Sequence, residues 1–209
     1  VSYLSLLSQV PTLLFGAPEQ VADVFRPDAE GRERHVRRPR NVKASGANHG
    51  AYFAVLDQVL TQTFGRPAPA QPKLLVDIGS GDGTFLAHAF DTVNPLDPTI
   101  LYVGVDLNQE ALDETRKTLE RHQIPLHRFV LVQGDILYPA EIDRAIRDAV
   151  RAHIRRYPEQ FSPEPWRDVG LADGLVAATF LNHNRPWRPV RNTDQAVARW
   201  LKTTTAVIG

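Results

Sequence analysis

The chain has 209 residues, of which 43% are apolar and 23% charged, a balance typical of one globular domain with a buried core. Its 24 basic and 24 acidic side chains cancel, so the net charge gives no support to a nucleic-acid partner. The chain has no cysteine, which excludes disulfides, thiolate metal sites and a cysteine nucleophile and fits a cytoplasmic protein. No apolar run is long enough to predict a transmembrane helix.

The first quarter of the chain is predicted to be helical and then basic. Residues 2–25 carry apolar side chains at loosely helical spacing, and Pro11 and Pro18 divide them into two or three short helices. Residues 26–43 are rich in arginine, which indicates either a solvated loop or a landing site for an anionic partner. We therefore assign residues 1–47 to an N-terminal helical lid or docking segment and residues 48–209 to the core domain.

Helices and apolar strands alternate along the rest of the chain. The first helix is amphipathic and spans residues 48–64, with a predicted apolar face of Tyr52, Val55, Leu56, Val59 and Leu60. Strands are predicted at 73–78, 101–107, 128–133 and 174–181, and further helices at 84–90, 109–123, 140–156 and 193–203. This alternation predicts an α/β fold, in which a parallel Rossmann-like sheet has helices on both faces.

A glycine-rich turn follows the first predicted strand. The segment from Val76 to Leu86 reads VDIGSGDGTFL, with glycines at positions 79, 81 and 83 and a helix directly after them. Glycine adopts positive φ easily and lets the backbone approach a ligand closely. At the end of a parallel strand, such a turn places the ligand in the crevice beyond the carboxyl edge of the sheet.

Two classes of cofactor compete for this turn. Dinucleotide-binding proteins use G-x-G-x-x-G, but the third glycine position, counted from Gly79, is Thr84. No Gly-Lys-Ser/Thr follows, which excludes a Walker-type phosphate loop. Asp77 precedes the first glycine by two positions and suits the ammonium group of a methionine-derived cofactor. The spacing therefore favours S-adenosylmethionine.

Acidic residues follow the next two predicted strands. Asp106 ends the second strand, where a carboxylate accepts hydrogen bonds from both hydroxyls of a ribose. This placement is shared with NAD-binding folds and by itself indicates only adenosine. After the third strand, Asp135 is placed to accept from the adenine amino group and Ile136 to pack on the ring. The alternative is that these acids are ordinary caps at strand ends.

The run from Val76 to Ile136 resembles the Rossmann-like class I methyltransferases, with Asp77–Gly83, Asp106 and Gly134–Ile136 matching the first three motifs of that family. The resemblance implies binding of S-adenosylmethionine and release of S-adenosylhomocysteine. It implies that the cofactor-binding residues are Asp77, Gly79, Gly81, Gly83, Asp106, Leu107, Asp135 and Ile136, with His49 and Phe180 near the same site. Because a class I sheet has further strands, we expect the core to be incomplete at Gly209.

A narrower resemblance rests on four motifs, which are NHGAYF at 48–53, DIGSGDGT at 77–84, GVDLN at 104–108 and FLNHNRP at 180–186. Together they are similar to C-methyltransferase domains in loading modules of apratoxin- and gephyronic-acid-type polyketide synthases, which lie beside an acetyltransferase-like decarboxylase. The resemblance covers roughly residues 40 to 190. It implies methylation of the α-carbon of malonyl on an acyl carrier protein, with the carrier and adjacent synthase domains as partners and neither nucleic acid nor membrane.

The narrower group also implies a mononuclear metal such as Fe or Mn, which would coordinate the malonyl unit as a Lewis acid. Its metal ligands come from a His and a Gln after the fourth strand. After Gly174, however, no His is followed five residues later by Gln. This departure leaves the metal ligands unknown.

The best candidates for catalytic residues follow the fourth predicted strand. His183 is flanked by Asn182 in a loop whose strand should face the methyl donor. His183 is either a general base, a metal ligand or a loop histidine that caps backbone groups. His49 lies before the first strand, in a region that closes over the cofactor in many related enzymes.

Three hypotheses for the function remain open at this point. The first is carbon methylation of a carrier-bound acyl group. The second is methylation of a free small molecule on oxygen or nitrogen. The third is a non-catalytic module that binds the cofactor. A requirement for a carrier protein and a metal would separate the first from the second.

Overall fold

The structure is a computed structural model, and it describes residues 4–16, 29, 34, 36–37, 40, 50–67 and 71–178. Two short helices, α1 (Leu4–Leu7) and α2 (Val10–Phe15), come first. Pro11 lies in the first turn of α2, where its missing N–H leaves no hydrogen bond unmade. The predicted division of this segment into short helices is thus confirmed for residues 4–15, whereas its role as a lid stays a prediction.

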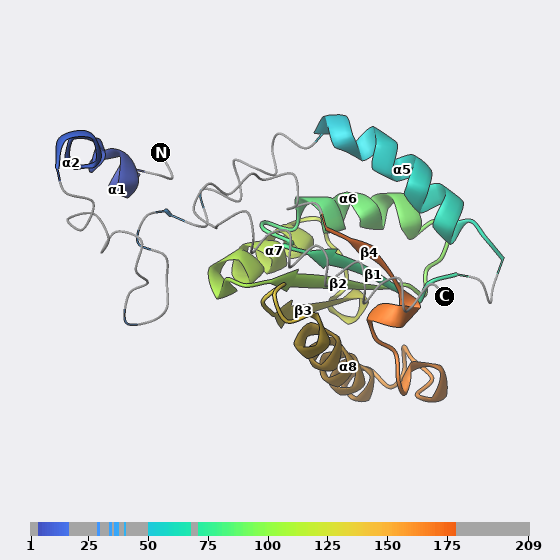
Figure 1. The fold of residues 1–209 in the computed structure, drawn as a ribbon. Coiled ribbons are helices and arrows are strands. Elements are labelled where there is room, and N and C mark those ends of the chain that lie inside the picture. The colour runs from blue at the N-terminus through green and yellow to red at the C-terminus, as the bar shows by residue number, and fades with distance from the viewer. Residues whose placement is uncertain are drawn as a thin grey trace.

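Four parallel strands form one sheet in the order β3-β2-β1-β4. The strands are β1 (Leu74–Ile78), β2 (Leu101–Asp106), β3 (Phe129–Gln133) and β4 (Gly174–Ala177). Helices α5 (Gly50–Phe64), α6 (Thr84–Val93) and α7 (Gln109–Arg121) lie on one face, and α8 (Pro139–Arg156) lies on the other (Figure 1). Short 3₁₀ turns η2 (Leu126–Arg128), η3 (Glu164–Trp166) and η4 (Leu171–Asp173) complete these elements. The predicted α/β architecture is confirmed.

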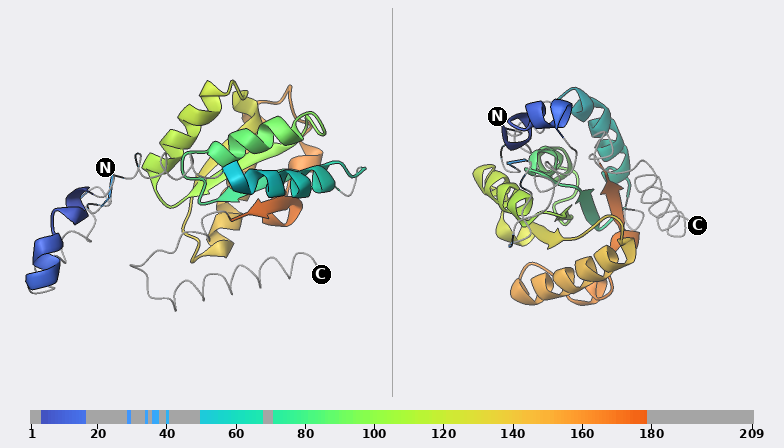
Figure 2. Two further views of the ribbon diagram at one scale, coloured as in Figure 1. Left: turned by 90° about the horizontal axis from the view of Figure 1, so that it is seen from above. Right: turned by 60° about the vertical axis from the view of Figure 1, so that its left-hand side comes forward.

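The sheet separates two hydrophobic cores. Figure 2 shows the same arrangement of sheet and helices from two further sides. Leu74, Val76 and Ile78 of β1 point toward α8, while Leu75 between them packs with α5 and α6. Side chains of a strand alternate between faces, and both faces of this sheet are covered by helices. The strands therefore read as continuous apolar runs, which is why the sequence predicts them well.

The buried face of α5 differs from the prediction. Leu60 and Phe64 are fully buried and Leu56 packs beside them, but Val55 and Val59 are 64% and 45% exposed. A helix turns about 100° per residue, so Leu60 and Phe64 define a stripe that leaves Val55 and Val59 on its outer side. The spacing showed an amphipathic helix but not which of two adjacent apolar stripes faces the core.

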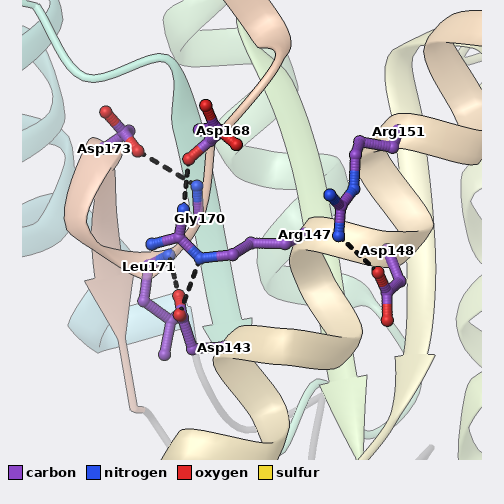
Figure 3. Close-up of polar contacts among 8 residues, drawn as sticks. All are labelled: Asp143, Arg147, Asp148, Arg151, Asp168, Gly170, Leu171 and Asp173. Carbon is purple, nitrogen blue, oxygen red and sulfur yellow. Dashed lines mark hydrogen bonds and ion pairs between the residues drawn. The ribbon is translucent and has the colours of Figure 1, made fainter.

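An arginine on α8 fixes the segment that leads into β4 (Figure 3). Arg147 Nε donates to Asp143 Oδ2 at 2.8 Å, and its Nη1 donates to the backbone carbonyl of Asp168. Asp143 Oδ1 in turn accepts from the backbone N–H of Leu171 at 2.8 Å. These contacts join α8 to a segment 21 or more residues later and so orient β4 against β1.

Tyr102 of β2 is buried at 1% exposed, and its ring packs against Phe90 at 5.3 Å. Among the described residues, its hydroxyl has no hydrogen-bond partner, and burial raises the pKa of Tyr102 above its ordinary value. Since an unpaired buried hydroxyl destabilises the fold, Tyr102→Phe should leave stability unchanged or raise it by up to about 1 kcal/mol. Urea unfolding measures this, with Tyr138→Phe at an exposed site as control. A clear loss of stability in Tyr102→Phe would contradict the expectation.

His153 of α8 is expected to make stability depend on pH. Its ring lies 4.8 Å from the Tyr157 ring, its Nε2 is 2.9 Å from the carbonyl oxygen of His127, and burial lowers the pKa of His153. The unfolded chain therefore takes up a proton first as pH falls, so the free energy of unfolding should decrease below about pH 6.5. Thermal unfolding between about pH 7.5 and 5.5 measures this slope, and His153→Gln should flatten it. An unchanged slope in His153→Gln would contradict the assignment.

Candidate functional site

The glycine turn between β1 and α6 adopts a backbone that requires glycine. Gly79, Gly81 and Gly83 have φ of 76°, 60° and 77°, all in the left-handed region. The N–H groups of Gly79 and Ser80 both donate to the carbonyl of Val105, at 2.7 and 3.0 Å. The turn is thereby bound to the carboxyl end of the neighbouring strand β2.

The turn opens directly into α6. Asp82 Oδ1 accepts from the backbone N–H of Thr84 at 3.1 Å and from its hydroxyl at 2.8 Å, which satisfies a donor of the first helical turn. Gly83 lies against α7, where an added Cβ would come within 2.8 Å of Thr115 Cγ2. Close packing of the turn on α7 therefore also excludes a side chain at this position.

Asp106 connects the second motif to the turn. Its Oδ2 accepts from the Gly81 N–H at 3.1 Å, and its Oδ1 accepts from the Asn108 N–H at 2.9 Å. Asp106 ends β2 and is half-buried, and its Oδ1 also accepts from Asn108 Nδ2 at 3.5 Å. An ionised carboxylate has about four lone-pair positions, so it has acceptor capacity left for a ligand.

Asp77 lies within the sheet and is 1% exposed. Its neighbours in register are Gly104 on β2 and Ala177 on β4. Residues in register point to the same face of a sheet, so these two small residues leave room for the carboxylate. The structure thus places Asp77 in the interior of the sheet, and its predicted contact with the cofactor stays a prediction.

The third motif lies beside the second. The Gly134 N–H donates to the carbonyl of Asp106 at 3.0 Å, and Asp135 Oδ1 accepts from the Leu137 N–H at 3.0 Å. Ile136 is partly buried against the core on the α8 face. Leu107 is 40% exposed and presents an apolar side chain at the same edge of the sheet. Hydrogen bonds therefore join all three predicted motifs, from the Gly81 N–H to the Asp106 side chain and from the Gly134 N–H to the Asp106 carbonyl.

Four predicted site residues lie outside the described residues. They are the catalytic candidates His183 and Asn182 and the cofactor candidates His49 and Phe180. The predicted helix at 193–203 also lies outside this range. In the part of the chain that the structure describes, no group of three or more His, Cys, Asp or Glu side chains is arranged to hold a metal ion. The same part contains no helix long and apolar enough to span a membrane.

Two features of the site region were missed by the sequence analysis. Thr115 of α7 donates to the carbonyl of Gly81 at 3.1 Å, and no motif marks it. His88 of α6, which belongs to no motif in the sequence, lies 2.7 Å from Asp57 Oδ1 and stacks on Phe53 at 4.3 Å. It is part of a polar cluster that joins α6 to α5.

Comparisons with known proteins give one family match. The family described as the AprA MT2-like domain, a methyltransferase domain family, matches residues 33–157. No curated protein matches the chain.

Solved structures resemble the chain only distantly. An O-methyltransferase family protein from Burkholderia thailandensis is 19% identical, with a TM-score of 0.38 over 51% of this chain and 30% of its own. A plantazolicin methyltransferase in complex with S-adenosylhomocysteine is 19% identical, with a TM-score of 0.32 over 46% and 34%. A putative O-methyltransferase from Klebsiella pneumoniae is 13% identical, with a TM-score of 0.40 over 93% and 84%. The chain thus spans about a third of the length of the first two.

Proposed function

The chain belongs to the AprA MT2-like domain family of S-adenosylmethionine-dependent methyltransferases, and on that premise we propose that it methylates the α-carbon of a malonyl-type acyl group on an acyl carrier protein. The observation that carries the cofactor part of this proposal is the contact between Asp106 and the Gly81 N–H at 3.1 Å. It brings the predicted ribose acceptor and the glycine turn to one point at the carboxyl edge of the sheet. The acceptor and the carrier are taken from the narrower resemblance.

The residues present fit S-adenosylmethionine. Gly81 leaves backbone without a Cβ beside the half-buried Asp106 carboxylate, which suits a ribose lying across the turn. The apolar side chains of Leu107 and Ile136 follow β2 and β3 at the same edge and suit the adenine ring. The cofactor supplies an electrophilic methyl group on a positively charged sulfur.

The transfer requires a carbon nucleophile. A malonyl thioester loses an α-proton to a base and becomes an enolate, whose α-carbon bonds to the methyl carbon as the carbon–sulfur bond breaks. S-adenosylhomocysteine then leaves as the neutral thioether. The described residues bind and orient the methyl donor, which is the proximity part of catalysis. His183 is the proposed base.

The described residues hold no set of His, Cys, Asp or Glu side chains arranged for a metal, and the region after β4, from which the narrower group draws its ligands, lies outside them. Adding Fe(II) or Mn(II) to the assay will show whether turnover depends on one.

The carrier is proposed as the partner because exposed arginines precede the core. Arg34, Arg37 and Arg40 are all exposed and belong to the basic stretch at 26–43. Guanidinium groups bind phosphate and carboxylate in a bidentate geometry, which suits the phosphopantetheine arm and an acidic carrier surface.

Mass spectrometry of malonyl on a carrier protein, incubated with the protein and S-adenosylmethionine, tests the function. We expect a mass gain of one methylene unit on the acyl group, located on carbon by NMR. Malonyl-coenzyme A serves as the carrier-free control and should react more slowly, and His183→Ala should abolish transfer while S-adenosylhomocysteine still binds. Methylation of oxygen or nitrogen, or of the free substrate alone, would contradict the proposal. A folded protein that binds the cofactor but transfers nothing would leave the non-catalytic module as the function.

A further inference from the structure

The glycine turn is attached to α7 by one buried hydroxyl. Thr115 is 0% exposed, and its Oγ1 donates to the carbonyl of Gly81 at 3.1 Å. The same oxygen lies 3.3 Å from Ser80 Oγ. A hydroxyl has one proton to donate, so Ser80 is the donor in the second pair. Threonine within a helix often bonds back to its own helix, but here it bonds to a segment 34 residues earlier.

Gly81 is held from both sides by this arrangement. Its N–H donates to Asp106 Oδ2 at 3.1 Å, and its carbonyl accepts from Thr115. Glycine has no side chain to limit its backbone, so these two hydrogen bonds restrain the dihedral angles that Gly81 would otherwise explore. The carboxylate proposed to receive the ribose therefore contacts the peptide before Gly81, and Thr115 holds the peptide after it.

We propose that Thr115 is a positioning residue for the cofactor, and that its hydroxyl holds the glycine turn in the conformation that binds S-adenosylmethionine. The inference rests on the use of that cofactor by this chain. Thr115 has two separable roles, because its Cγ2 methyl also fills the space beside Gly83. Thr115→Val keeps the shape and the methyl but loses the hydroxyl, whereas Thr115→Ser keeps the hydroxyl and loses the methyl. The two variants form a matched pair.

Calorimetric titration with S-adenosylhomocysteine, carried out on the whole chain, measures the effect. We expect Thr115→Val to weaken affinity about tenfold, as for the loss of one buried hydrogen bond, and Thr115→Ser to remain within about threefold of the original protein. Thermal unfolding of both variants controls for stability. If Thr115 had a purely structural role, its variants would bind more weakly only because a smaller fraction of the protein is folded. Equal affinity in Thr115→Val, or an equal loss in Thr115→Ser, would overturn the proposal.

Hydrogen exchange of the unliganded protein supplies a second readout. The amides of residues 81–83 should exchange faster in Thr115→Val than in Thr115→Ser, because the first releases the Gly81 carbonyl. Unchanged exchange in Thr115→Val would overturn the inference even if the original protein failed to bind S-adenosylhomocysteine. Failure of the original protein to bind would contradict the cofactor assignment itself, so the two failures are distinguishable.

Discussion

Replacing Asp106 with alanine is expected to weaken the binding of S-adenosylhomocysteine by about 100-fold or more. The variant removes a charged acceptor for two ribose hydroxyls, and hydrogen bonds to charged groups contribute about 1.5–3 kcal/mol each. It also releases the Gly81 N–H, so the glycine turn loses one of its restraints. Calorimetric titration measures the affinity, and thermal unfolding shows how much of the effect arises from the fold.

Two further variants sharpen this test. Asp106→Asn keeps one acceptor oxygen and the size of the side chain but loses the charge, so its affinity should be intermediate. Asp113→Ala removes an exposed carboxylate on α7 that bonds to Gln109, and it should bind as the original protein does. If Asp106→Ala bound S-adenosylhomocysteine as tightly as Asp113→Ala does, the assignment of the ribose site would be wrong.

The second large effect is expected from Gly83→Ala, which should lower the free energy of unfolding by about 2–4 kcal/mol. Gly83 has φ of 77°, a conformation that costs alanine energy. The new Cβ would also lie 2.8 Å from Thr115 Cγ2 and 3.0 Å from Thr115 Cα, so α6 and α7 must separate to admit it. Urea unfolding measures the loss.

A double variant separates the two causes. Thr115→Ala removes the Cγ2 atom, so Gly83→Ala should cost less in that background than in the original chain. In that background Gly83→Ala should still lower the free energy of unfolding somewhat, because the contact with the Cα of residue 115 and the positive φ both remain. A destabilisation that vanished completely in the double variant would show that the backbone conformation contributes nothing.

Much of the fold was predictable because its signals are local. In β1 every residue is buried, since helices cover both faces of the sheet, and the strand reads as an apolar run with Asp77 as its one charged member. The three glycines also indicate a tight turn, because positive φ at alternate positions favours glycine. Asp106 was predictable for a related reason, as parallel strands bring their carboxyl ends to one edge.

The contacts that adjust the site were not predictable from the sequence. Thr115 bonds to Gly81 across 34 positions, and His88 bonds to Asp57 across 31. Neither pair has a periodic signal, because the distance between the partners depends on how α5 and α7 pack on the sheet. Tertiary packing also decided that Val55 and Val59 of α5 face outward, since the spacing of apolar residues allows either stripe to be buried.

The sequence by itself therefore determined the class of fold and the residue types of the glycine turn, since backbone conformation and strand patterning are properties of short segments. Only the tertiary structure decided the interior position of Asp77, the two restraints on Gly81 and the link from Arg147 to the segment before β4. Each of these depends on side chains from separate elements meeting at hydrogen-bond distance. That outcome is set by the packing of whole helices on the sheet.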